Sequence, residues 1–562
     1  MQSNTSASSD FKPGASVSKA SSAVLYYFIA LASPVLIAIW FVPWFVTQDG
    51  PLHVYNAYLY SSLSREDSPL AEFYAPRGGV LPYVGVYKLL AGLMSLLSAR
   101  AADRILMMLT SIGLACSVLW LRWRVVGLEG MHNVVPLALI LAVSHLWLLG
   151  LYSFLLGASL FSAILGLWWN WRNSLTATRA VMIGGLLALG YLFHIISTGI
   201  SVFALVVLAF VTPGTTLRKR LLWTAASVAP SIILMIGFGA LVNSSGGGAV
   251  QWIGLTDPFS IQNWIQYLQV PDFVSLSFKQ TWGVLAIPTD CPFVAQTAVQ
   301  YALLWPSLWA FGGLVLLVAS TLQRRGIRAR LLQSEYRGWI LLALCLFSVG
   351  LFGPSAAGQG SILRERVLLL GMVTLLPLIK PGPKTSTARI GALCLVVALL
   401  LQIAFVLDYA RISNRIAGAV MQVAPHLESS EKVALLVPDP RTHYAVNPLP
   451  GIANELGVSR EGIVWNNYGP AFYYFPIQFR SDQVRDQWKR MDSLNQLLLS
   501  GEFETAAKEN PEGWVAAIGS TLEHTDVLVV WGAEPWFDAL FERRFQSEPF
   551  LEEGGARAFR LR

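Results

Sequence analysis

Apolar runs of nearly twenty residues recur along the chain between Tyr26 and Asp408. A helix of that length crosses the roughly 30 Å of hydrocarbon in a bilayer. We predict about eleven spanning helices, at residues 23–46, 104–121, 132–148, 153–170, 179–194, 196–212, 220–242, 299–320, 338–353, 364–380 and 388–408. So many spans exclude a soluble enzyme with a single anchor, and they predict an all-α polytopic membrane protein.

The segment 82–98 could be a further span or a helix that lies along the membrane surface. If it does not cross, the later Arg/Lys clusters, such as Arg122 with Arg124 and those at 324–330, all lie in cytoplasmic loops. If it crosses, the same clusters move outside and break the positive-inside rule at every one of these loops. Lys88 in its middle would also be costly at the bilayer centre. We therefore predict that this segment stays on the outer surface, with the N-terminus in the cytoplasm and the C-terminus outside.

The composition agrees with a membrane protein. Of the 562 residues 54% are hydrophobic and 13% are charged, whereas a soluble protein carries about 25% charged residues. The net charge of +7 comes mostly from short loops between apolar runs, where it orients the chain in the membrane. No nucleic-acid partner is therefore predicted. The four cysteines lie mostly inside apolar runs, so no disulfide framework is indicated.

Three regions follow from these patterns. Residues 1–22 are Ser-rich and predict a flexible cytoplasmic tail, and residues 23–408 form the membrane domain. Residues 409–562 mix strand-like and helical stretches and predict a small extracytoplasmic α/β domain. The outer loops at 47–103 and 243–298 are long enough for binding or lid elements. The predicted location is the plasma (inner) membrane.

The first outer loop opens on polar residues directly after the first span. Asp49 emerges at the surface, Pro51 suits the first turn of a following helix, and His53 lies one helical turn beyond Asp49. The carboxylate could serve chemistry, or it could simply cap that helix.

Two other outer features carry polar or aromatic side chains. Tyr152 lies in the break 149–153 between two spans, which is typical of a tight helical hairpin. His194 lies at the outer end of another span, where a lone histidine more often packs than binds. For Tyr152 the alternatives are a hairpin turn and a site residue, and for His194 they are a packing residue and a binding residue; all stay open.

A late pair of arginines runs against the positive-inside bias. Arg364 and Arg366 lie at the outer end of a span, on either side of Glu365. They could pair with that carboxylate or with lipid phosphate. The interpretation we favour is that their guanidinium groups bind a phosphorylated substrate.

Taken together, these motifs resemble those of the GT-C superfamily of membrane glycosyltransferases. That group includes the protein O-mannosyltransferases and the bacterial transferase that adds aminoarabinose to lipid A. The first-loop run 49–57 looks like the signature of bacterial members, and the run 360–366 looks like their late arginine motif. The resemblance covers residues 23–408.

The resemblance implies a polyprenyl-phosphate-linked sugar as donor and an acceptor that is a glycan, a lipid or a protein, glycosylated with inversion. It implies that Asp49 is the catalytic carboxylate and that Arg366, with Arg364, holds the donor phosphate. His53, Tyr152 and His194 would be pocket residues that contact substrate.

This chain departs from the pattern at Gly50, where many relatives have a second acidic residue. A divalent ion usually needs more than one carboxylate. No cofactor is therefore certain, and whether a divalent metal binds stays open. Glu66, Asp67, Glu72 or Asp257 could supply a further ligand.

Two other functions compete with a transferase. One is a transporter or flippase for lipid-linked saccharides, which would need ionisable residues near the middle of several spans. The other is a non-enzymatic scaffold for polysaccharide assembly. In the C-terminal domain, the aromatic and amide-rich run 465–474 could bind sugar or could be core.

Overall fold

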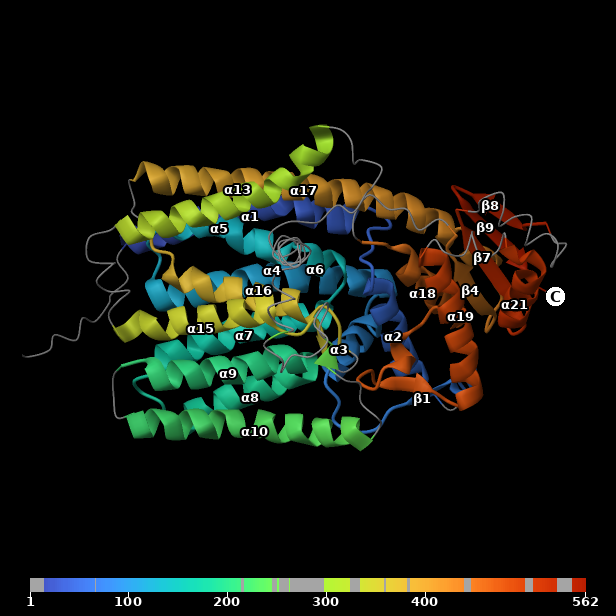
Figure 1. The fold of residues 1–562 in the computed structure, drawn as a ribbon, viewed down its shortest axis with the longest axis horizontal. Coiled ribbons are helices and arrows are strands. Elements are labelled where there is room, and N and C mark those ends of the chain that lie inside the picture. Colours follow the sequence, from blue (N-terminus) through green and yellow to red (C-terminus); the bar gives the residue numbers. More distant parts are fainter. Residues whose placement is uncertain are drawn as a thin grey trace, which may run out of the picture.

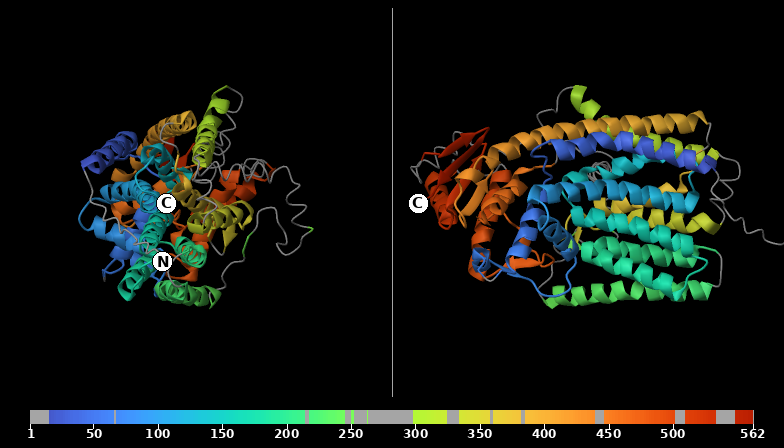
Figure 2. Two further views of the ribbon diagram at one scale, coloured as in Figure 1. Left: turned by 90° about the vertical axis from the view of Figure 1, so that its left-hand side faces the viewer. Right: turned by 180° about the vertical axis from the view of Figure 1, so that it is seen from behind.

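The computed structural model is a long helical bundle with a smaller domain at one end (Figure 1). It describes residues 15–65, 67–213, 217–244, 250–251, 262, 298–323, 334–357, 360–381, 385–438, 446–500, 509–532 and 548–561. The bundle contains the apolar helices, and the smaller domain contains the C-terminal sheet. Figure 2 shows from behind and end-on that the long helices lie side by side.

Every predicted span coincides with a helix. These helices are α1 (Ala15–Phe41), α4 (Ala99–Val126), α5 (Met131–Ala142) with α6 (His145–Leu148), α7 (Tyr152–Trp171), α8 (Ala177–Phe193), α9 (Ile195–Val211), α10 (Leu217–Ser244), α13 (Ala298–Gln323), α15 (Ser334–Phe352), α16 (Leu363–Leu375) and α17 (Ser386–Met421). Within the described residues, 7 helical segments are long and apolar enough to cross a membrane alone, and α8, α9 and α15 are shorter apolar helices. The chain is a multi-pass membrane protein.

The ambiguous segment does not form a span. Helix α3 (Val84–Met94) has 11 residues, so it is only about 16 Å long. It packs against α2 (Gly50–Ser62), α4 and α8, at the end of the bundle that meets the C-terminal domain (Figure 1).

The C-terminal domain is the predicted α/β unit. Its five-stranded sheet has the order β5-β4-β7-β9-β8; β4 pairs in parallel with β5 and β7, whereas β7, β9 and β8 are antiparallel. The strands are β4 (Lys432–Leu436), β5 (Ile463–Val464), β7 (Val527–Trp531), β8 (Leu551–Glu553) and β9 (Ala556–Arg560), and the helices are α18 (Leu449–Arg460), α19 (Asp482–Ser500) and α21 (Pro511–Leu522).

Alternate residues of its central strands serve two different cores. Ala434 and Leu436 of β4 pack with side chains of α19 and α21. Val433 and Leu435, which point the other way, join the core that continues into the membrane bundle. Because successive side chains of a strand face opposite sides, β4 is buried on both faces, as is usual for a strand that pairs in parallel on both sides.

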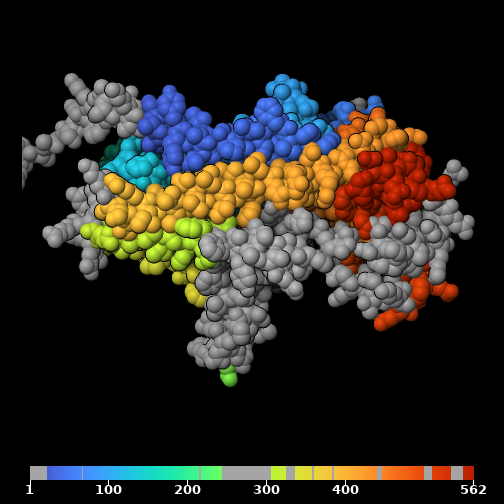
Figure 3. All heavy atoms as spheres, turned by 90° about the horizontal axis from the view of Figure 1, so that it is seen from above, coloured from blue at the N-terminus to red at the C-terminus, as the bar shows by residue number. Residues whose placement is uncertain are grey.

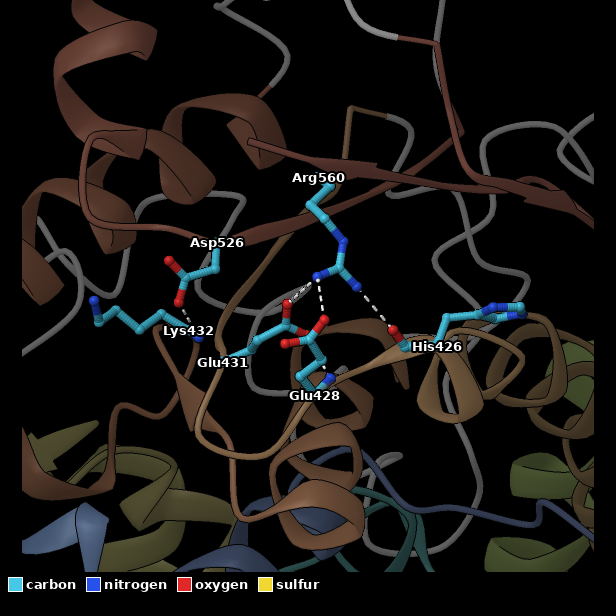
Figure 4. A network of polar contacts seen from close by, with 6 residues as sticks. All are labelled: His426, Glu428, Glu431, Lys432, Asp526 and Arg560. Carbon is cyan, nitrogen blue, oxygen red and sulfur yellow. Dashed lines mark hydrogen bonds and ion pairs between the residues drawn. The ribbon is translucent and has the colours of Figure 1, made fainter. Parts of the chain in front are cut away.

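Polar contacts fasten this sheet to the end of α17 (Figure 4). Arg560 of β9 lies 2.6 Å from Glu431 and donates to the His426 carbonyl at 2.9 Å. The Asp526 carboxylate accepts from the backbone N–H of Lys432 at 2.8 Å. These contacts involve the segment that follows α17. Figure 3 shows α17 itself, which runs along the bundle between α1 and α13.

The first loop and the C-terminal domain are joined by a second set of contacts. Strand β1 (Tyr74–Pro76) pairs with β6 (Ile477–Phe479). Asn56 and Asn467, both fully buried, exchange hydrogen bonds of 2.9 and 3.3 Å through their side-chain amides. The amides of the run 465–474 are therefore used inside the protein: Asn467 holds α2, and Asn466 pairs with both backbone groups of Leu435.

We expect Asn467→Leu to lower the free energy of unfolding by about 1–3 kcal/mol. The buried Asn56 Oδ1 would lose its donor, and Asn56 Nδ2 would keep the Leu52 carbonyl but lose Asn467. The measurement is thermal unfolding of the purified protein in detergent. Arg65→Ala is the control, because it removes an exposed Arg65–Glu461 ion pair, worth about 0–1 kcal/mol, together with a hydrogen bond to Ser62 from the same exposed guanidinium. Equal losses in the two variants would contradict a structural role for the amide pair.

Candidate active site

A cavity of about 560 Å³ lies between the end of the bundle and the C-terminal domain. The membrane domain contributes Gln48, Asp49, His53, Tyr83, Leu151, Ser153, Phe154, His194, Gly360, Ser361, Ile362 and Arg366, and the C-terminal domain contributes residues between Val437 and Gln496. Its size is typical of a ligand pocket. Four of the six predicted site residues line it, and they come from three separate parts of the chain: Asp49 and His53 at the start of α2, His194 after α8, and Arg366 in α16.

The turn between α6 and α7 fixes the backbone at Asp49. The N–H groups of Gln48 and Asp49 donate to the carbonyls of Leu148 and Leu149 at 3.0 and 3.2 Å. Gly150 in this turn has φ +78°, and a Cβ there would lie 3.0 Å from the Asp49 nitrogen. Only glycine combines that conformation with so close an approach. The predicted hairpin turn is therefore real, and it also positions the carboxylate.

The Asp49 side chain is not used as a helix cap. The residue occupies the N-cap position of α2, with Pro51 in the first turn, but its carboxylate makes no capping hydrogen bond. It accepts hydrogen bonds from Tyr468 and Gln48 instead. The Gln48 amide is oriented for this, because its oxygen accepts from the Asn447 N–H at 3.1 Å.

The electrostatics of the site suit a base. Burial raises the pKa of the Asp49 carboxyl to about 6, and the hydrogen bonds from Tyr468 and Gln48 and the charge of Arg366 oppose the rise. A carboxylate in this range is ionised at neutral pH and is a stronger base than an exposed aspartate.

Arg366 faces the same cavity from the first turn of α16. Its Nη1 lies 3.1 Å from His194 Nε2, and its buried Nε has no hydrogen-bond partner among the described residues. His194 Nδ1 accepts from the Ser197 N–H at 3.2 Å, which assigns the imidazole proton to Nε2. Two donors then lie 3.1 Å apart, an arrangement that an anionic group accepting hydrogen bonds from both would relieve.

The remaining predicted residues have supporting positions. His53 lines the cavity, its Nδ1 lies 2.9 Å from the Tyr87 hydroxyl, and burial lowers its pKa to about 4, so it is neutral. Tyr152 and Arg364 do not line the cavity. The Tyr152 hydroxyl lies 2.8 Å from Thr47 Oγ1 and donates to Asp103 at 3.1 Å. Arg364 donates to the Gly353 carbonyl at 2.6 Å.

Two of the four described non-glycine residues with positive φ lie at this cavity. Tyr83 and Ile362 both line it and have φ of +72° and +57°. Neither is glycine, so each conformation is costly and requires support from its surroundings. Ile362 directly precedes α16 and thereby sets where Arg366 points.

No family model and no curated protein matches the chain. Among solved structures, arabinofuranosyltransferase AftD from Mycobacteria matches with a TM-score of 0.47 and 12% identity, over 97% of this chain and 40% of that one. ArnT from Cupriavidus metallidurans in the apo state matches with a TM-score of 0.43 and 11% identity, over 96% and 98%. A second ArnT structure, bound to undecaprenyl phosphate, has a TM-score of 0.40.

The motifs at 49–57 and 360–366 resemble those of the GT-C glycosyltransferases. At 11–12% identity and TM-scores below 0.5, the solved structures carry no argument about this chain. Its chemistry rests on the residues of its own cavity.

The sequence did not reveal the residues that the C-terminal domain supplies. Tyr468 contacts Asp49, and Tyr474 stacks on Tyr83 with ring centroids 4.8 Å apart. Both belong to the aromatic and amide-rich run 465–474, whose position relative to Asp49 does not follow from the sequence. Most of the outer loop 243–298 lies outside the described residues, except that β2 (Val250–Gln251) pairs with β3 (Ala356–Ala357), beside the segment that leads to Arg366.

The structure offers no ready metal site in its described parts, where no group of three His, Cys, Asp or Glu side chains could hold an ion. Glu66 and Asp257 lie outside these parts. A metal requirement stays a prediction to be tested.

Arg366→Gln is expected to weaken binding of a polyprenyl phosphate at least about ten-fold, because among the described residues Arg366 is the one Lys or Arg side chain that lines the cavity. Native mass spectrometry or thermophoresis of the purified protein measures this. Lys88→Gln, an exposed change on α3 at the same end of the bundle, is the control. Equal affinities in the two variants would remove Arg366 from the binding site.

Proposed function

We propose that the protein is an inverting glycosyltransferase that moves a sugar from a polyprenyl-phosphate-linked donor to an acceptor hydroxyl outside the cytoplasm. The observation that carries this proposal is that a carboxylate with a raised pKa, Asp49, and a guanidinium with an unpaired N–H, Arg366, line one cavity. One is suited to activate a nucleophile, and the other to receive a phosphate leaving group.

The proposed reaction is a single displacement. Asp49 takes the proton of the acceptor hydroxyl while the oxygen of that hydroxyl attacks the anomeric carbon of the donor sugar. The bond from that carbon to the phosphate oxygen breaks, and its electron pair leaves with the polyprenyl phosphate. Because attack and departure occur on opposite faces, the anomeric configuration inverts.

The phosphate would find a favourable electrostatic setting at Arg366. The residue lies in the first turn of α16, where the helix dipole favours negative charge. His194, held by the Ser197 N–H at the start of α9, adds a second donor. These groups would stabilise the charge that develops as the leaving group departs.

The position of the cavity also suits a lipid-linked donor. Its membrane-domain lining lies where spans end, at α1, α7, α8 and α16. A polyprenyl chain could stay in the bilayer while its phosphate and sugar enter this polar space. A transporter would instead need ionisable residues along a path through the bilayer, whereas Asp49 and Arg366 face a single cavity at one end of the bundle.

Asp49→Asn is expected to lower sugar transfer by about 10²–10⁴-fold, the usual contribution of a general base. The amide keeps the size of the side chain but cannot take the proton. The assay follows the release of polyprenyl phosphate and the formation of product by purified protein. Asp67→Asn, an exposed change in the same loop, is the control and should be fully active. Full activity of Asp49→Asn would remove Asp49 from the chemistry.

The rate should fall as the pH drops through about 6, because protonation of Asp49 removes the base. Tyr468→Phe should move this acidic limb to higher pH, since the lost hydrogen bond lowers the pKa of Asp49 in the wild type. The variant should therefore be slow near pH 6 and recover as the pH rises. The profile of kcat/KM against pH measures the shift, with Tyr60→Phe on α2 as control. An unshifted limb would separate Tyr468 from Asp49.

A further inference from the structure

One wall of the cavity carries a polar helix face that has no role in the displacement at Asp49 and Arg366 described above. Helix α19 contributes residues spaced by four, three and one positions, which lie on one side of a helix: Trp488, Asp492, Asn495 and Gln496. This face belongs to the C-terminal domain and continues the space that begins at Asp49. The space is larger than a single donor sugar needs.

Hydrogen-bonding capacity on this face is unfilled. Asn495 Oδ1 is buried and has no hydrogen-bond partner among the described residues, an arrangement that costs free energy unless a ligand or water supplies a donor. Asp492 is half-buried, and burial raises the pKa of its carboxyl, with the Gln496 side chain as its hydrogen-bonding neighbour. By contrast, the amide of Asn466 is taken by the backbone of Leu435.

An aromatic surface accompanies these acceptors. Trp488 is partly exposed to the cavity, and its ring packs against Phe479 with centroids 5.6 Å apart. That contact fixes the indole with little rotamer freedom left to lose when a ligand binds. A ring of this kind offers an apolar face beside polar groups.

The chemistry of the face selects among ligand classes. Amide and carboxylate oxygens accept hydrogen bonds from hydroxyl groups, and an indole covers the apolar face of a sugar ring. The described lining from the C-terminal domain contains no Lys or Arg, which disfavours a phosphate or nucleotide. Its density of polar groups disfavours a lipid tail. A ligand with many hydroxyl groups and an apolar ring face fits best.

We propose that this face of α19 is the acceptor subsite, and that the acceptor is a saccharide whose terminal sugar reaches Asp49 while the preceding sugar rests on Trp488, Asp492 and Asn495. The proposal rests on the proposed function, because only a sugar transfer requires an acceptor beside Asp49. It narrows the acceptor from a glycan, lipid or protein to a chain of sugars.

The test measures binding and transfer separately. Isothermal titration calorimetry of short soluble oligosaccharides is performed on the full-length protein in detergent, for the wild type, Asn495→Leu and Asp492→Asn. Each variant should weaken binding of the oligosaccharide that binds best by about ten-fold or more, the effect of losing a buried hydrogen bond. Ser493→Ala, an exposed change on the same helix, should bind like the wild type. Thermal unfolding confirms that the variants are folded.

The second readout compares two products of the donor: sugar transferred to the oligosaccharide and sugar released by hydrolysis. The ratio of transfer to hydrolysis should fall about ten-fold in Asn495→Leu and Asp492→Asn. Equal binding by all proteins, or donor turnover without any oligosaccharide binding, would overturn the acceptor subsite. Oligosaccharide binding that depends on Asn495, with no donor cleavage by the wild type, would support the subsite while contradicting the proposed transferase.

Discussion

The whole site depends on keeping one carboxylate ionisable inside a cavity from which most water is excluded. Taking Asp49 out of water raises the pKa of its carboxyl, and Tyr468, Gln48 and Arg366 together limit the rise to about 6. Without these groups the pKa of the buried carboxyl would lie higher, and less of the carboxyl would be ionised at neutral pH to accept a proton. With an arginine salt-bridged directly to it, the carboxylate would be a weak base. The pKa of Asp49 lies between these limits, and Arg366 Nε has no partner among the described residues, so it can bind a second anion.

The fold supplies that arrangement from both of its domains. The membrane domain holds the backbone of Asp49 through the turn at Gly150, and it presents Arg366 after the strained residue Ile362. The C-terminal domain brings Tyr468 to the carboxylate and Asn447 to Gln48. The Asn56–Asn467 pair and the β1–β6 ladder lock the two domains together. The C-terminal domain is therefore a wall of the site, and its removal would open the cavity to water.

Much of this was predictable from the sequence, and the rest was not, for physical reasons. The spans and the nature of segment 82–98 follow from local hydropathy and loop charge, which act over one helix at a time. Asp49 and Arg366 stood out because each is costly or unexpected at a span end. Tyr468 and Asn495 could not be found in this way, because their importance comes from contacts between residues hundreds of positions apart. Tyr152 and Arg364 were predicted to contact substrate, but neither lines the cavity. Tyr152 contacts Thr47 and Asp103, and Arg364 donates to the Gly353 carbonyl.

The central claim is that one cavity holds the donor phosphate at Arg366 and the reacting sugar at Asp49. The most direct measurement is a cryo-EM structure of Asp49→Asn with a polyprenyl-phosphate sugar, at a resolution that separates phosphate from sugar. The account predicts the phosphate against the guanidinium of Arg366 and His194 Nε2, and the anomeric carbon on the side that faces residue 49. Density for the phosphate elsewhere, with the 560 Å³ cavity empty, would contradict it.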